Sequence, residues 1–209
     1  MTLRWYFDFI SPFAYLQWPR VRALGEIHAI EYLPIVFAGL LDRNATKGPA
    51  EIPGKREFTY RFVHWRAQRA GVPLRFPPEH PFNPLPALRL CIAAGATAQS
   101  ITAINEWIWA GGRRGDSARA LAPVARELGI ADVEAAISAP AVKARLKANF
   151  DAACADGVFG VPTLVVDGEP FWGEDATDFA IACLRDPELL ADPEMQRLRT
   201  LPEGARRGG

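Results

Sequence analysis

Cysteine and histidine are both scarce in this sequence, and neither residue type is grouped. The 209 residues include three cysteines and three histidines, which are Cys91, Cys154, Cys183, His28, His64 and His80. No two cysteines form a CxxC pair, and the histidines lack the spacing of metal ligands. The sequence therefore predicts neither a disulfide framework nor a metal site. Each cysteine lies in a stretch rich in Ala, Ile or Leu, which favours buried and unreactive thiols.

The sequence also lacks an excess of charge of either sign and any long hydrophobic run. Its 24 basic and 24 acidic side chains cancel, and the pI is about 6.8. Proteins that bind nucleic acids or anionic membranes normally carry a basic excess, so we predict neither partner. No apolar run approaches the ~20 residues that span a bilayer. The N-terminus lacks the features of a signal peptide, and we therefore expect a cytoplasmic protein.

Strand and helix patterns alternate at the start of the chain. Leu3–Ile10 is aromatic and rich in β-formers, which predicts a strand. A helix is predicted from Pro12 to about Leu24, because proline suits the first turn of a helix. Ala29–Val36 predicts a second strand. The usual right-handed crossover through the helix would make these two strands parallel.

The middle of the chain carries helix and loop patterns, and strand patterns return only near the end. Residues 43–55 are polar and rich in Pro and Gly, which indicates a loop. The predicted helices are 55–70, 85–94, 100–110, 118–128 and 142–155. Two short strands, 163–166 and 169–172, are joined by the hairpin turn Asp167-Gly168. A final helix is predicted at 175–184 with Asp175 as its N-cap, and the tail ending LPEGARRGG is expected to be disordered.

The order of these elements predicts the fold class. A β-α-β unit, a long helical segment and a β-β-α unit together give an α/β, thioredoxin-like fold interrupted by an all-helical insertion domain. We expect the thioredoxin-like domain to comprise residues 1–37 and 156–209, and the insertion domain to comprise residues 38–155.

Ser11 is the first candidate site residue, because it ends the first strand and opens the first helix. A helix N-terminus presents unpaired N–H groups and a partial positive charge, which stabilise an anion or a thiolate. A serine hydroxyl at this position can donate a hydrogen bond to such a thiolate. The alternative is that Ser11 is only an N-cap, with Pro12 at the first helical position.

Two further segments are expected at the same edge of the sheet. The bond between Val161 and Pro162 precedes the late hairpin, and a cis proline there would expose backbone groups that pair with an extended cysteinyl peptide. The alternative is an ordinary trans turn. The segment Trp172, Gly173, Glu174 and Asp175 lies between the last strand and the last helix, and it can hold a ligand carboxylate and ammonium. The alternative there is a simple helix cap.

Four segments carry a resemblance to a known family. They are YFDFISPFAYL, KGPAEIPGKREFTYR, HPFNPLPALRL and GVFGVPTLVVDGEPFWGED. Together they resemble 2-hydroxychromene-2-carboxylate isomerases, which are relatives of kappa-class glutathione transferases and, more distantly, of bacterial thiol-disulfide oxidoreductases. The resemblance extends from about Tyr6 to Leu184. The CxxC pair of the oxidoreductases would fall at Ser11 and Ala14, so a cycle through an internal disulfide is not expected.

The resemblance implies a cofactor and a role for each candidate residue. Glutathione is the expected cofactor, with catalytic Ser11 supporting its thiolate, Val161-Pro162 pairing with its cysteine, and Trp172–Asp175 binding its γ-glutamyl end. The implied reaction interconverts 2-hydroxychromene-2-carboxylate and trans-o-hydroxybenzylidenepyruvate, as in aromatic-compound catabolism. A thiolate adds to the opened, conjugated substrate, the former double bond rotates, and elimination returns glutathione unchanged.

The substrate site and the partners are implied less directly. A small aromatic carboxylate needs a cation and a polar anchor, for which Lys47 is the first choice, Arg56 the second, and Asn83 the polar contact. Arg43 and Lys55 remain open as other choices. A homodimer is expected from the resemblance. The alternative functions are a kappa-like glutathione transferase acting on electrophiles and a non-catalytic glutathione-binding module.

Overall fold

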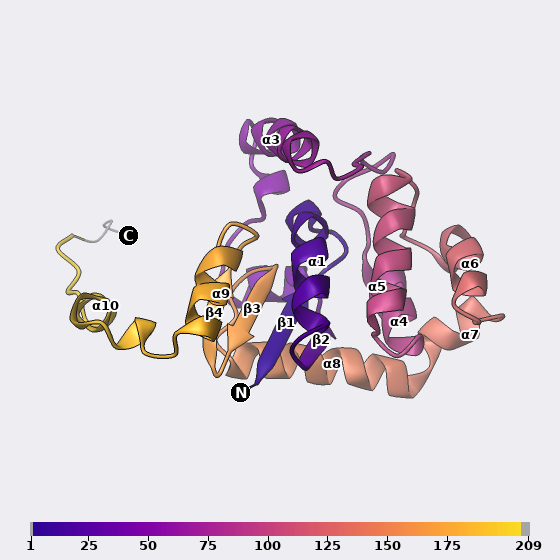
Figure 1. Ribbon diagram of the computed structural model, residues 1–209. Coiled ribbons are helices and arrows are strands. Elements are labelled where there is room, and N and C mark those ends of the chain that lie inside the picture. The colour runs from indigo at the N-terminus through magenta and orange to yellow at the C-terminus, as the bar shows by residue number, and fades with distance from the viewer. Residues whose placement is uncertain (1, 206–209) are drawn as a thin grey trace.

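The computed structural model describes residues 2–205 and places a four-stranded sheet at the centre of the chain (Figure 1). Its strands are β1 (Leu3–Phe7), β2 (Ile30–Pro34), β3 (Thr163–Val166) and β4 (Glu169–Trp172), in the order β2-β1-β3-β4. β1 and β2 are parallel, and the other neighbours are antiparallel. The predicted parallel pair and late hairpin are therefore confirmed. β1 is shorter than predicted because the chain turns at Asp8, whose carbonyl accepts the Ser11 N–H at 3.0 Å.

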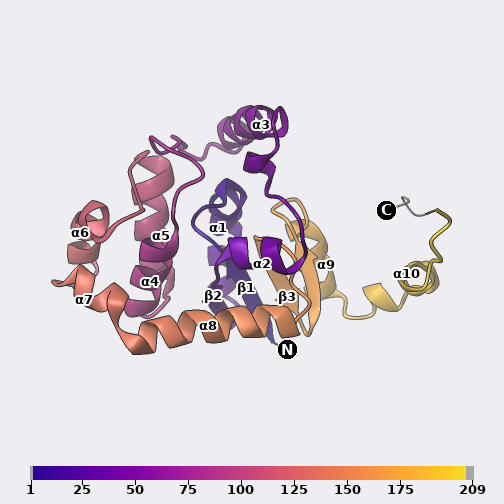
Figure 2. The same cartoon turned by 180° about the vertical axis from the view of Figure 1, so that it is seen from behind.

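Helices cover both faces of the sheet (Figures 1 and 2). Side chains alternate along β1, so Trp5 faces α1 (Pro12–Gly25) and Tyr6 faces the opposite way. α9 (Thr177–Arg185) packs on β3 and β4, on the same side as α1. On the opposite face, α2 (Phe37–Arg43) and α8 (Pro140–Ala155) bury Tyr6 with a second set of apolar side chains. The thioredoxin-like, mixed α/β fold is confirmed.

The remaining helices of the insertion expected at residues 38–155 lie beside the sheet. They are α3 (Lys55–Ala70), α4 (Leu85–Ala93), α5 (Ala98–Asn105), the π-helix Glu106–Ala110, α6 (Ala118–Glu127) and α7 (Val133–Ser138). α2, α7 and the short 3-10 helix Pro49–Glu51 were not predicted. α8 begins two residues earlier than predicted, with Pro140 in its first turn. A single set of buried side chains joins the insertion to α1 and to the sheet, so the insertion can position the sheet edge.

The C-terminal segment extends away from the sheet, and α10 (Pro193–Arg199) lies apart from it in both views (Figures 1 and 2). A 3-10 helix, Leu189–Ala191, connects α9 to α10. This 3-10 helix and α10 were not predicted. The expectation of a disordered tail after the final helix is therefore wrong for residues 189–199; residues 201–205 contain no helix or strand, and residues 206–209 lie outside the described part of the chain. No helix within residues 2–205 is both long enough and apolar enough to cross a membrane.

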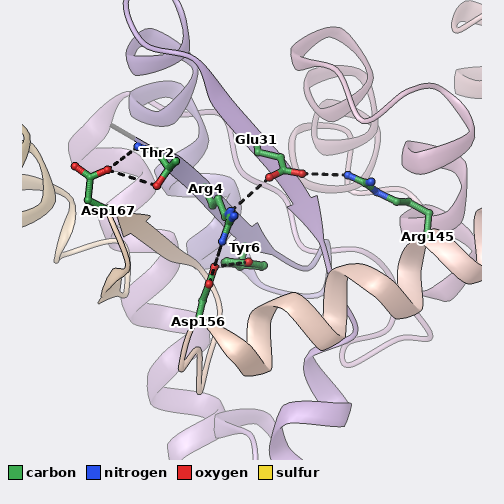
Figure 3. Close-up of polar contacts among 7 residues, drawn as sticks. All are labelled: Thr2, Arg4, Tyr6, Glu31, Arg145, Asp156 and Asp167. Carbon is green, nitrogen blue, oxygen red and sulfur yellow. Dashed lines mark hydrogen bonds and ion pairs between the residues drawn. The ribbon is translucent and has the colours of Figure 1, made fainter.

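A cluster of charged side chains fixes α8 to the edge of the sheet (Figure 3). Asp156 accepts two hydrogen bonds from Arg4, at 3.0 and 2.9 Å, and one from the Tyr6 hydroxyl at 2.6 Å. Glu31 of β2 pairs with Arg4 at 3.4 Å and with Arg145 of α8 at 3.2 Å. Burial and the adjacent Asp156 carboxylate raise the pKa of Tyr6. The cluster therefore links α8 to both β1 and β2.

Candidate functional site

The register of the sheet brings the three candidate segments to one edge. Thr163, the first residue of β3, pairs with Tyr6 near the end of β1 and with Trp172 at the end of β4. The segment after β1, the segment before β3 and the segment after β4 therefore leave the sheet at the same edge. These segments contain Ser11, Val161-Pro162 and Trp172–Asp175, so the structure brings together the residues expected to hold glutathione.

Ser11 is the N-cap of α1. Capping uses its hydroxyl oxygen as an acceptor, so the hydroxyl proton remains available to donate to a ligand. Its Oγ accepts the Ala14 N–H at 3.3 Å, and its backbone carbonyl accepts the N–H groups of Ala14 and Tyr15. Within residues 2–205 the Ser11 hydroxyl donates to no acceptor, although the residue is only 8% exposed. In the first turn of α1, Pro12 has no N–H, and only the Phe13 N–H lacks an acceptor among residues 2–205. Two donors are thus free at this helix end.

The Val161-Pro162 bond is cis and lies just outside the strand ladder. The ladder begins at Thr163, and the Pro162 carbonyl accepts the Gly173 N–H at 2.8 Å. No backbone hydrogen bond within residues 2–205 involves Val161. An extended peptide can therefore pair with the backbone of Val161 as an added strand.

Trp172 forms an exposed aromatic surface beside this backbone. It is 55% exposed, and its ring lies 5.2 Å from the ring of Phe159. Its indole also lies against Gly160, where an added Cβ would be 2.4 Å from the indole Nε1. Gly160 therefore permits the close approach of Trp172 to the turn that contains Val161.

Glu174 carries a carboxylate whose electrostatic partner comes from the insertion. Its Oε2 lies 2.6 Å from Nη2 of Arg66 on α3, and the side chain is 12% exposed. Burial raises the pKa of Glu174, and the Arg66 guanidinium opposes that shift. Asp175 is exposed and is not the N-cap of α9 as predicted, because the helix begins at Thr177 after Ala176. The Asp175 carboxylate is accessible to a ligand.

Gln17 fixes this loop to the sheet and was missed in the sequence. It is fully buried in α1, and its Oε1 accepts the Trp5 indole N–H at 2.7 Å. Its Nε2 donates to the Gly173 carbonyl at 3.2 Å and to the Thr177 hydroxyl at 2.9 Å. One side chain thereby connects β1, α1 and the segment after β4. A single glutamine in the apolar stretch FAYLQWP was the available signal.

We expect Gln17→Leu to lower the free energy of unfolding by about 3 kcal/mol, because it leaves buried donors and acceptors without partners. The measurement is the urea midpoint of the variant against that of the wild type. Gln99→Leu, at an exposed position of α5, is the matched control and should change the free energy by less than about 0.5 kcal/mol. Equal losses in the two variants would contradict the role of Gln17.

The three residues expected to bind substrate differ in their surroundings. Lys47 is exposed in the loop after α2, and its ammonium group has no partner among residues 2–205. Arg56 is occupied, since it donates to the His80 carbonyl at 2.6 Å and to the Tyr60 hydroxyl at 3.1 Å. The Asn83 Oδ1 accepts the Leu85 N–H at 3.1 Å at the start of α4. Within residues 2–205 these three side chains make no hydrogen bond or ion pair with one another, so this set stays a prediction.

The cysteines of the chain are not arranged for disulfide exchange. All three are free, and Cys91 and Cys183 are buried. Burial raises the pKa of Cys91 to about 12, and it also raises the pKa of Cys183. Within residues 2–205, no group of three or more His, Cys, Asp and Glu side chains is placed to hold a metal ion. A thiolate at this site would therefore come from a bound molecule.

Comparison with known proteins places the chain in a family. Residues 2–182 match the DSBA-like thioredoxin domain. The chain is 31% identical over 188 residues to a 2-hydroxychromene-2-carboxylate isomerase of Pseudomonas putida, covering 84% of this chain and 90% of that protein. The chain belongs to the DSBA-like thioredoxin domain family, within its 2-hydroxychromene-2-carboxylate isomerase group.

Relatives of this DSBA-like family member include both isomerases and transferases. The solved structure of a 2-hydroxychromene-2-carboxylate isomerase superposes with a TM-score of 0.76 at 26% identity, covering 92% of this chain and 98% of that one. A kappa-class glutathione transferase of Caenorhabditis elegans is 25% identical over 184 residues, covering 80% of this chain and 82% of that protein. The resemblance inferred from the sequence is confirmed. The DSBA-like fold here carries Ser11 and Ala14 in place of a CxxC pair.

Proposed function

We propose that the protein is a glutathione-dependent isomerase that interconverts 2-hydroxychromene-2-carboxylate and trans-o-hydroxybenzylidenepyruvate. One observation carries the proposal, which is the convergence of Ser11, Val161-Pro162 and Trp172–Asp175 at one edge of the sheet. The similarity to named isomerases over most of the chain supports the same reaction.

The residues at the sheet edge fit glutathione. The tripeptide has an extended cysteinyl backbone, a thiol, and a γ-glutamyl end that carries an ammonium and a carboxylate. Val161 offers unpaired backbone, Ser11 offers a hydroxyl proton, and the Asp175 carboxylate offers an acceptor for the ammonium. When bound, glutathione supplies a thiolate nucleophile that can add reversibly to a conjugated carbon.

Ser11 and the end of α1 have a defined task in this proposal. A free thiol with a pKa near 8.5 is only a few per cent ionised at neutral pH. The Ser11 hydroxyl and the Phe13 N–H donate toward the sulfur, and the α1 dipole adds a favourable field. Together these groups lower the thiol pKa and increase the fraction of nucleophile.

The test is to mix the protein with 2-hydroxychromene-2-carboxylate, with and without glutathione, while recording the ultraviolet spectrum and titrating free thiol. Isomerisation that needs glutathione but does not consume it is the expected result. Consumption of thiol in proportion to product would instead identify the kappa-like transferase. Binding of glutathione with neither reaction would identify a non-catalytic binding module.

The substrate carboxylate is proposed to bind Lys47. Its ammonium has no partner within residues 2–205, whereas Arg56 is occupied by His80 and Tyr60. We expect Lys47→Ala to raise KM about tenfold with kcat within about twofold, as for lost binding that the ground and transition states share. Lys143→Ala, which removes an exposed ammonium from α8, is the control and should leave both constants unchanged. An unchanged KM in Lys47→Ala would transfer the role to another cation of the 43–56 segment.

A further inference from the structure

Side chains of the insertion hold the backbone that leads to Ser11. Two backbone groups of this loop bond within the loop, since Ile10 N–H donates to the Asp8 carboxylate and Ser11 N–H donates to the Asp8 carbonyl, both at 3.0 Å. The carbonyls of Phe9 and Ile10 are bonded by side chains of the insertion. The Phe9 carbonyl accepts the Trp109 indole N–H at 2.9 Å, and the Ile10 carbonyl lies 2.8 Å from Nε2 of His80.

Trp109 reaches the loop from a segment 100 residues away in the chain. It belongs to the π-helix Glu106–Ala110 that continues α5, and such π segments occur frequently at functional sites. The residue is completely buried, with its ring between those of Tyr15, Phe76 and His80 at centroid distances of 5.4–6.4 Å. This packing holds the Trp109 ring so that its indole N–H points to the Phe9 carbonyl.

The tautomer of His80 follows from its two partners. The Ile10 carbonyl can only accept, so Nε2 carries the proton. Nδ1 of the neutral ring is then an acceptor, and it faces the Tyr60 hydroxyl, which lies 2.6 Å from Nδ1 and 2.9 Å from the His80 carbonyl. Burial lowers the pKa of His80 and outweighs the opposing effect of the hydrogen bond to Ile10, and the nearby Arg56 guanidinium also lowers it, which favours the neutral ring. His80 is therefore a fixed donor to the loop.

Resting on the proposed function, we propose that Trp109 and His80 are positioning residues that align Ser11 with the glutathione sulfur. Both ends of the Ile10–Ser11 peptide group are bonded, its carbonyl by His80 and its N–H by Asp8, so its plane cannot rotate without breaking a bond. The orientation of this peptide group sets the direction in which the Ser11 side chain leaves the backbone. The insertion therefore supplies part of the thiolate stabilisation, in addition to any contacts with substrate.

The test measures ionisation of the bound thiol rather than turnover. The ultraviolet absorbance of the thiolate is followed against pH in protein saturated with glutathione, and the Kd is measured by calorimetry. We expect Trp109→Phe and His80→Leu each to raise the pKa of the bound thiol by about one pH unit. At any pH below that pKa, the ionised fraction of the bound glutathione then falls about tenfold. The Kd, measured at a pH well below the pKa of the bound thiol, should change less than about threefold, because the sulfur is then a neutral thiol in every variant and the tripeptide backbone contacts remain.

Matched variants separate positioning from general damage. His80→Gln keeps an N–H near the place of Nε2 and should retain the wild-type thiol pKa. Trp107→Phe removes a neighbouring indole whose N–H donates to the Arg114 carbonyl at 2.9 Å, outside the loop, and should also have no effect. If the bound thiol has the wild-type pKa in both Trp109→Phe and His80→Leu, the inference is overturned and the proposed function is not. Failure of the wild type to bind glutathione would overturn the proposed function and the inference with it.

Discussion

Replacing Ser11 by alanine is expected to lower kcat about 100-fold, the usual cost of removing one donor to a charge at a reaction centre. The Kd for glutathione, measured at a pH where the bound sulfur is still a protonated thiol, should rise less than about tenfold, because the hydroxyl then makes one hydrogen bond to a neutral group. The contacts proposed for Val161 and Trp172–Asp175 do not depend on the hydroxyl. The measurement is turnover at saturating glutathione together with calorimetric affinity.

The loss of an N-cap must be separated from the loss of a hydroxyl at the sulfur. Ser117→Ala is the matched control, because Ser117 caps α6 by accepting the Ala120 N–H at 3.3 Å, the same distance at which Ser11 accepts the Ala14 N–H at α1. Each alanine should cost about 1 kcal/mol of stability through its cap. Only Ser11→Ala should slow turnover. A large loss of affinity with unchanged turnover would contradict the catalytic role of Ser11.

The elements predicted from the sequence are those that local patterns determine. The Asp167-Gly168 hairpin and α3 form as predicted, because a turn dipeptide and long helical periodicity act over short distances. α2 and α7 were missed because they have only seven and six residues, too few for a helical period to stand out. α9 begins later than predicted because the side chain of Asp175 does not cap it.

The residues of the candidate site also fall into those that local patterns predict and those that they do not. Ser11, Val161 and Trp172 were found because each flanks a strand, and strand ends meet at sheet edges. Gln17 and Trp109 were missed because each acts on a backbone carbonyl 156 or 100 residues away. Such pairings depend on the packing of the insertion against α1 and the sheet. No residue type or spacing in the sequence encodes them locally.

Asp8 makes the stability of this site depend on pH. It is completely buried, and its two carboxylate oxygens accept the N–H groups of Ile10 at 3.0 Å and Phe37 at 2.9 Å. Burial raises its pKa from 3.8 to about 7, against the opposing effect of those two hydrogen bonds. Between these values the folded protein holds a proton that the unfolded chain releases. The stabilisation that the protonated Asp8 gives the folded protein is therefore complete below the unfolded pKa of 3.8, and it is lost as the pH rises through about 7.

We therefore expect Asp8→Asn to become more stable relative to the wild type as the pH rises from about 4 to about 8, by about 4 kcal/mol in total. An asparagine cannot accept both N–H groups, so the variant carries a constant penalty of about 1–3 kcal/mol, and only the slope tests the titration. Urea midpoints at each pH supply the difference. Ser117→Ala, which removes an N-cap hydroxyl at an exposed position and no titratable group, should show no slope. A flat difference for Asp8→Asn would mean that the buried carboxyl ionises as easily in the folded protein as in the unfolded chain, with the Ile10 and Phe37 N–H groups offsetting its burial.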